Sequence, residues 1–200
     1  KVSFHVADTS ILLDDWHIRT HIWGRLYSRR LLSKIILPPS IKIGEDTAFN
    51  LLLFCSKQNT CVARVTEALY FYFQREDSIV HTVPHAGKID VALFFVEQYT
   101  AIKDTDKYGI VLHEILRNML AYRYLMSFSD DQESIRKTCR SIYAFCKRNW
   151  VSSFPVKEKM KYSILYYCPF VYRLFRIITD PTMLDWERIE KKRQQEKVER

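Results

Sequence analysis

The sequence predicts a mostly helical α+β fold, and two patterns along the chain support this prediction. Up to about residue 85, short segments alternate apolar and polar residues or are rich in β-branched and aromatic residues, as strands are. Beyond His85, apolar residues recur at the spacing of amphipathic helices. We therefore expect a mixed region at residues 1–85 and a helical region at residues 86–200. With 48% hydrophobic residues, the chain can fill a core.

The N-terminal region should contain four strands and two helices. Strands are expected at residues 2–7, 21–27, 60–65 and 68–75. A brief basic helix should follow Ser28, a favourable N-cap, and end near residue 34. Ala48, Leu51, Leu52 and Cys55 have helical spacing, so a second helix is expected at residues 46–57.

Five long helices are expected in the second region. They should span residues 86–103, 107–128, 131–149, 156–178 and 183–198. Asp130 or Asp131 and Pro155 are the start signals for the third and fourth of these helices. The last helix has the polar sequence "WERIEKKRQQEKVER" and should be exposed to solvent.

The five cysteines form no CxxC pair, and most lie in apolar surroundings. This pattern favours reduced, buried thiols in a cytosolic setting over a disulfide framework or a zinc site.

The net charge of +8 and the pI of about 9.2 favour an anionic partner. Residues 147–176 combine seven Lys or Arg residues with eight aromatic residues and one acid, Glu158. The longest apolar run there, "ILYYCPFVY" at 164–172, is much shorter than the roughly 20 residues that span a bilayer. The segment fits either a helix at an anionic membrane surface or a core helix with a basic rim.

Two adjacent acids, Glu45 and Asp46, open an apolar helix in "IKIGEDTAFNLLLFC". Carboxylates in a first helical turn usually accept hydrogen bonds from unpaired amides and interact favourably with the helix dipole. A carboxylate held there can also serve as a general base. Residue types alone leave both roles open.

Three ordered blocks, "IWGRLYSRRLL" (22–32), "PPSIKIGEDTAFN" (38–50) and "LYFYFQREDSIVH" (69–81), resemble motifs of the family 2 glycosyltransferases with a GT-A fold. The similarity is to bacterial members that build capsular and other surface polysaccharides. The matching residues are Trp23, Leu26, Tyr27, Arg30, Leu32, Glu45, Asp46, Phe49, Tyr70, Tyr72, Arg75, Ser78 and Ile79. Arg25 stands where the family usually has lysine, which keeps the charge and changes the donor geometry.

This resemblance implies inverting transfer of a sugar from a nucleotide donor to an acceptor hydroxyl. Asp46 would be the base that takes the hydroxyl proton, and Glu45 would orient the acceptor or hold the loop. Trp23 would form a platform for the acceptor sugar, and Arg25 and Tyr27 of the same block would also bind substrate. A core position for the Trp23 indole is the alternative.

The third block is expected to handle the leaving group. Arg75 and Ser78 would hold the departing diphosphate, and His81 would contact phosphate or metal. The simpler alternatives are an ion pair of Arg75 with Glu76 or Asp77 and a solvated His81.

The resemblance also implies a nucleotide-binding half with a D-x-D motif that holds Mg or Mn. The string "DTD" at 104–106 follows the acceptor blocks between two helices, which is the wrong order for that motif. The chain starts at Lys1, so we expect it to be the C-terminal part of a longer transferase, with most metal ligands elsewhere. The complete enzyme would act in the cytoplasm at the inner face of the cell membrane.

Two other classes fit parts of the sequence. A zinc protein is suggested by the i, i+4 pairs His17–His21 and His81–His85, although Val83-Pro84 opposes a helix within the second pair. A non-catalytic basic helical module that binds anionic membrane or nucleic acid is the other alternative. It leaves the three blocks unexplained, so no nucleic acid is expected as a partner.

Overall fold

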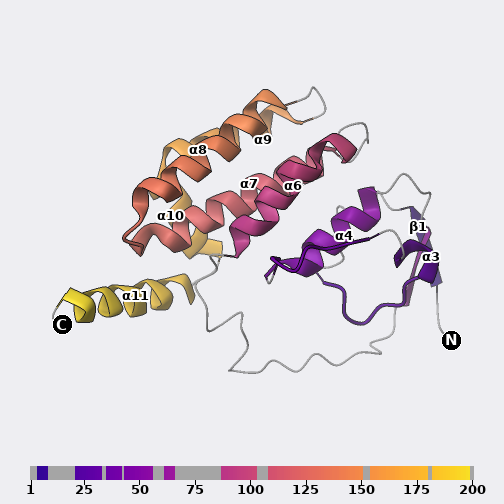
Figure 1. The fold of residues 1–200 in the computed structure, drawn as a ribbon, viewed down its shortest axis with the longest axis horizontal. Helices are drawn as coiled ribbons and strands as arrows, with labels where there is room; N and C mark the ends of the chain where they lie inside the picture. Colours follow the sequence, from indigo (N-terminus) through magenta and orange to yellow (C-terminus); the bar gives the residue numbers. More distant parts are fainter. Residues whose placement is uncertain are drawn as a thin grey trace.

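Helices dominate the chain in the computed structural model (Figure 1). The structure describes residues 4–8, 21–32, 35–41, 43–55, 61–65, 87–102, 108–150, 154–179 and 182–198. From residue 87 onward, every described segment is a helix or a connection beside one. The prediction of a mostly helical chain is therefore confirmed.

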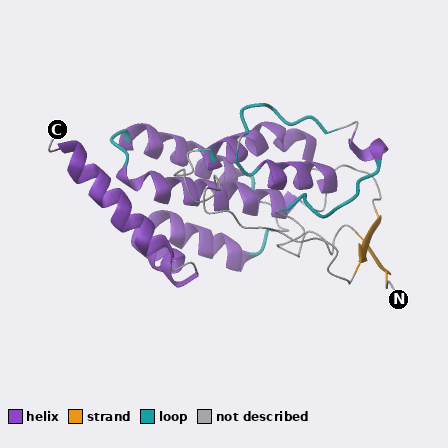
Figure 2. Cartoon of the chain, turned by 90° about the horizontal axis from the view of Figure 1, so that it is seen from below, coloured by secondary structure: helices purple, strands orange, loops and turns teal. Residues whose placement is uncertain are grey.

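Two of the four predicted strands are present. β1 (Phe4–Asp8) and β2 (Cys61–Val65) pair antiparallel, with Phe4 opposite Val65 and Asp8 opposite Cys61. Figure 2 shows this pair near the N-terminus, far from the C-terminus. The strand predicted at 21–27 is wrong: this segment contains a turn at Trp23–Gly24, where Gly24 has a φ of 70°. That left-handed backbone suits glycine and is incompatible with an extended strand. The strand predicted at 68–75 lies outside the described residues.

Both predicted N-terminal helices are found. α3 (Arg29–Leu32) follows Ser28, whose carbonyl accepts a hydrogen bond from the Leu32 N–H at 3.3 Å. α4 (Glu45–Cys55) begins with the two acids and buries Ala48 and Leu51 completely. These residues share one core with α6 of the helical region, so α4 is held against that region rather than standing apart.

The helical region is built around α7. α6 (Lys88–Ile102), α7 (Tyr108–Leu125) and α8 (Gln132–Arg148) lie side by side, with the 3-10 turn η1 (Met126–Phe128) after α7 (Figure 1). α7 packs against α6, α8, α9 and α10, which explains why most of its residues are buried. Asp131, one of the two predicted start signals, caps α8, and its carboxylate accepts a hydrogen bond from the Ser134 N–H at 3.2 Å.

The helix predicted at 156–178 is two helices, α9 (Val156–Tyr167) and α10 (Pro169–Thr179). Cys168 separates them with φ −117° and ψ 79°. Pro169 explains the break, because proline disfavours a helical conformation in the residue before it and cannot donate the next helical hydrogen bond. Proline is instead well suited to the first turn of a new helix, where α10 has it.

The final helix, α11 (Thr182–Val198), is polar as predicted but is not entirely solvent-exposed. Its Glu187 is 4% exposed and accepts hydrogen bonds from Tyr124 of α7 and Arg173 of α10. An ion pair between the buried Glu187 carboxylate and the partly exposed Arg173 guanidinium thus attaches α11 to α10. No helix in the described part of the chain has the length and apolar character needed to cross a bilayer.

Three cysteines, Cys139, Cys146 and Cys168, are free thiols. Cys139 and Cys146 on α8 are buried as expected, and burial raises their pKa values to about 11 and about 12. Cys168 is exposed at the helix break.

Lys88, at the start of α6, provides a pH-dependent prediction. Burial lowers the pKa of its ammonium group to about 8, and the nearby Arg117 and Arg176 contribute. Between pH 8 and about 10.4 the unfolded chain binds the proton more tightly, so stability should rise with pH across this window. At pH 7 Lys88 is protonated in both the folded and the unfolded chain, so the full free-energy cost of burying its charge is present. We expect Lys88→Met to stabilise the fold at pH 7 by about 1–3 kcal/mol, and by clearly less at pH 10.

Urea unfolding of both proteins at the two pH values measures this effect. The matched control is Lys137→Met on α8, where the lysine is exposed and little change is expected at either pH. A stabilisation by Lys88→Met that is equal at pH 7 and pH 10 would contradict the assignment of the lowered pKa.

Candidate functional site

The segment at residues 21–28 lies against the first two turns of α4 and contacts Asp46. The Ile22 N–H donates a hydrogen bond to Oδ2 of Asp46 at 3.3 Å. The structure thus joins the first and second sequence blocks at one carboxylate, through two residues that are 24 positions apart in the sequence.

Asn50 provides the main polar link between these blocks, and the sequence analysis missed it. Its side chain is fully buried, and Nδ2 donates to the His21 carbonyl at 3.0 Å. Oδ1 accepts from Nη1 of Arg25 and from the Tyr27 hydroxyl, each at 3.4 Å. Asn50 follows Asp46 by four residues, so both lie on the same face of α4. The sequence did contain a signal for this role, because Asn50 is a polar residue inside the apolar run at helical spacing from Asp46.

The two acids occupy different environments. Glu45, the first residue of α4, is exposed, whereas Asp46 is partly buried. Desolvation raises the pKa of the Asp46 carboxyl, although the Ile22 N–H and the nearby His21 and Arg25 lower it. A carboxylate with a raised pKa is a stronger base than an ordinary aspartate. Of the pair, Asp46 therefore has the properties suited to accepting a proton.

Two of the predicted substrate-binding residues, Arg25 and Tyr27, lie near enough to this carboxylate to interact with it electrostatically. Trp23 is 38% exposed and stacks on His21 with ring centroids 4.8 Å apart, so the alternative of a core indole is wrong. Tyr27 packs edge-on against Phe49 of α4 at 5.2 Å, and burial raises the pKa of its phenol. Arg25, Tyr27 and Asn50 form one hydrogen-bonded group that orients the segment, and the Trp23 ring remains partly exposed to solvent.

Gly44 sets the entry to α4 at this site. Its φ is +82°, and a Cβ built there would lie 2.9 Å from Cγ2 of Val91 on α6. Only glycine adopts this backbone readily and also allows α6 to approach so closely. The position of Asp46, two residues later, therefore depends on Gly44.

We expect Gly44→Ala to destabilise the protein by about 1–2 kcal/mol from the backbone alone, with a further loss from the overlap with Val91. Chemical denaturation of a double-mutant cycle separates the two contributions. In a Val91→Ala background, the Gly44→Ala change should cause only the backbone loss, because the obstructing methyl group is gone. A Gly44→Ala protein as stable as the parent would overturn this account.

The remaining predicted site residues lie outside the described residues. They are Arg75, Ser78 and His81. The "DTD" string at 104–106, which was not expected to be the metal motif, and His17 and His85 of the zinc alternative also lie outside the described residues. Within the described ranges, no three His, Cys, Asp or Glu residues are grouped as a metal site would require.

Comparisons of this chain with protein-family models, curated proteins and solved structures gave no match.

Proposed function

We propose that this chain is the acceptor-side, C-terminal portion of an inverting family 2 glycosyltransferase with a GT-A fold. The complete enzyme would move a sugar from a nucleotide-sugar donor to a hydroxyl of a glycan or lipid-linked acceptor in bacterial surface-polysaccharide synthesis. One observation supports this proposal above all others. The Trp23–Tyr27 block and the Glu45–Asp46 block, which resemble separate family motifs, meet at the partly buried carboxylate of Asp46.

In this proposal Asp46 removes the proton from the acceptor hydroxyl as that oxygen attacks the anomeric carbon. The base must be ionised and rigidly held, and its position in the first turn of α4 favours both. Glu45 orients the acceptor from the exposed side, and the Trp23 ring supports the apolar face of its sugar. Asn50 is a positioning residue that holds Arg25 and Tyr27 beside the carboxylate.

The donor side of the reaction rests on the sequence resemblance alone. Arg75 and Ser78, with His81, are proposed to hold the departing diphosphate through charge-assisted hydrogen bonds. A divalent Mg or Mn ion would neutralise the same group, with ligands mainly outside this chain. Cytoplasmic action at the inner face of the cell membrane belongs to the same proposal.

The test is an assay of the complete transferase with its nucleotide-binding half. Purified enzyme is incubated with individual nucleotide sugars, with and without oligosaccharide or lipid-linked acceptors, and released nucleoside diphosphate is measured. Acceptor-dependent release would support the proposal. No release from any donor would favour the alternative, a non-catalytic interaction module.

A further inference from the structure

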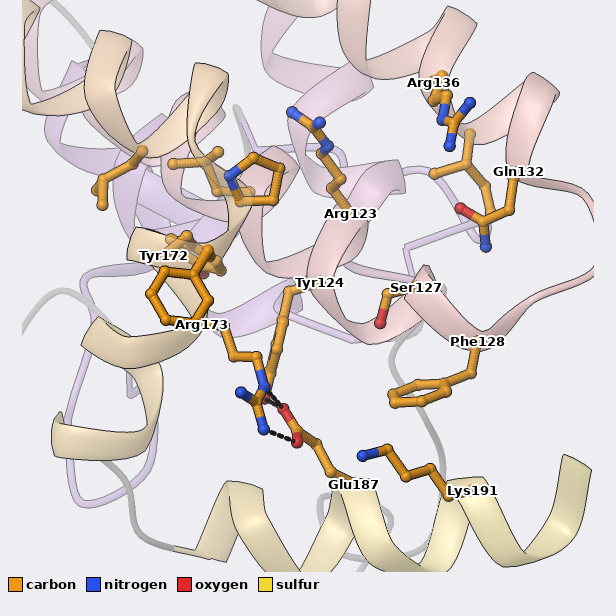
Figure 3. A pocket seen from close by; sticks show the side chains of 15 residues that line it. Arg123, Tyr124, Ser127, Phe128, Gln132, Arg136, Tyr172, Arg173, Glu187 and Lys191 are labelled. Atoms are coloured by element: carbon orange, nitrogen blue, oxygen red, sulfur yellow. Dashed lines mark hydrogen bonds and ion pairs between the residues drawn. The ribbon is translucent and has the colours of Figure 1, made fainter.

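Helices α7 to α11, together with η1, line a cavity of about 400 Å³ that the proposed sugar transfer does not use (Figure 3). This volume lies within the range of about 300–1,000 Å³ that is usual for small-molecule sites. The cavity is therefore large enough for a compact ligand such as a phosphorylated headgroup.

The cavity is positively charged. Four cations line it: Arg123, Arg136, Arg173 and Lys191. Among the described residues that line it, Glu187 is the single acid. A site with this excess of positive charge favours an anionic ligand.

Glu187 does not cancel that excess, because Arg173 already neutralises it. Nε and Nη2 of Arg173 donate to the two carboxylate oxygens of Glu187, each at 2.7 Å, and the Tyr124 hydroxyl donates to Oε1 at 2.6 Å. The Arg173 interaction also lowers the pKa of the Glu187 carboxyl. Among the described residues of the cavity, Arg123, Arg136 and Lys191 supply the remaining positive charge, and Lys191 also interacts electrostatically with Glu187.

Arg123 is held in place by groups that carry no net charge. Its Nη1 donates to the Tyr166 carbonyl at 2.7 Å, and the guanidinium carbon lies 5.1 Å from the Tyr166 ring centroid. Figure 3 shows Arg123 and Arg136 on one side of the cavity and Lys191 on the other, with the Ser127 side chain between them. An anion in this space would therefore be attracted from both sides.

An exposed apolar surface on α10 adjoins the cavity, and we call it the α10 stripe. It consists of Phe170, Val171, Leu174, Phe175 and Ile178. Their spacing places them on one side of the helix, and they are 39–79% exposed. Phe170 also lines the cavity, so the apolar stripe and the basic cavity meet at this side chain.

We propose that the cavity binds the phosphate of an anionic phospholipid headgroup while the α10 stripe enters the acyl layer of the same membrane. A basic site beside exposed aromatic and aliphatic side chains is complementary to the two parts of such a lipid. A second copy of this chain fits less well, because each copy carries a net charge of +8 and symmetric contact would bring two basic cavities together. The sequence prediction for residues 147–176 is thereby refined, since Arg123, Arg136 and Lys191 lie outside that segment.

Vesicle flotation tests this inference without a nucleotide sugar, so its outcome is independent of the proposed transferase activity. Neutral phosphatidylcholine vesicles are compared with vesicles that also contain phosphatidic acid. The test variant is Arg136→Gln/Lys191→Gln. The matched control is Lys137→Gln/Lys192→Gln, which removes the same charge from exposed neighbouring positions on the same two helices that do not line the cavity. Circular dichroism checks that each variant is folded.

The parent chain should float with the acidic vesicles and much less with the neutral ones. Each cation near an anionic surface strengthens binding by about fivefold. The cavity variant lacks two such cations, so it should bind on the order of 30-fold more weakly than the parent. The control should lose much less, and Leu174→Gln/Ile178→Gln should also reduce flotation. Equal losses in the cavity and control variants would overturn the headgroup site. Binding of inorganic pyrophosphate without flotation, or self-association blocked by Leu174→Gln/Ile178→Gln, would overturn the membrane as its partner.

Discussion

Replacing Asp46 with asparagine is expected to reduce sugar transfer by the complete proposed transferase by about 10²–10⁴-fold, the usual contribution of a general base. Asparagine has nearly the same shape, remains a good residue near a helix start, and keeps a carbonyl oxygen that can accept the Ile22 N–H. The change therefore removes the proton acceptor and little else. Donor binding should be largely unchanged, because other residues are proposed to hold the diphosphate.

Steady-state kinetics with an acceptor series measures this loss, and melting temperatures exclude unfolding as its cause. Glu45→Gln is the matched control: it removes the neighbouring charge from an exposed position and should reduce turnover less. The pH profile adds a second readout. Because desolvation raises the pKa of Asp46, turnover should begin to fall, as the pH is lowered, at a pH above the pKa of an ordinary aspartate, which is about 3.9. An Asp46→Asn enzyme with near-parental turnover would reduce the pair to a helix cap.

The largest expected effect on stability comes from Phe95→Ala. Phe95 on α6 is fully buried and packs edge-on with Phe94 at 5.4 Å. Removing a buried phenyl ring loses its transfer free energy and leaves a cavity, which together cost about 3–5 kcal/mol. A domain is commonly stable by only about 5–15 kcal/mol, so this one change could remove most of the margin.

Urea unfolding followed by circular dichroism measures the change. Leu93→Ala on the same helix is the control, since Leu93 is 38% exposed and its loss should be much smaller. If Phe95→Ala does not fold, Phe95→Leu provides a milder version with the same expected direction. Similar free energies of unfolding for Phe95→Ala and Leu93→Ala would contradict the described core.

Local chemistry accounts for most of the secondary structure that the sequence predicted correctly. Hydrophobic period located α6, α7 and α8, and the Asp131 cap located the start of α8. The errors came where single backbone positions outweighed the pattern. Gly24 turns the chain within a stretch with strand-like composition, and Pro169 divides a continuous helical pattern.

The candidate site was only partly readable from sequence. Glu45 and Asp46 were evident as adjacent acids before an apolar run, but their different burial depends on contacts with residues 21–28. The sequence also did not decide whether Trp23 is buried or exposed, because an indole suits both a core and an exposed platform. Asn50 was missed since its partners, His21, Arg25 and Tyr27, come from a segment more than 20 residues away.

The amino-acid sequence is sufficient to predict a mostly helical chain with an acid pair at a helix start and a basic, aromatic C-terminal region, because these features depend on neighbours within a few turns. Tertiary structure was needed to bring the Trp23 segment to Asp46, to bury Glu187 against Arg173, and to form a basic cavity beside the α10 stripe. Each of these results from packing between distant segments. Such packing sets the desolvation and charge proximity that give the side chains their chemistry.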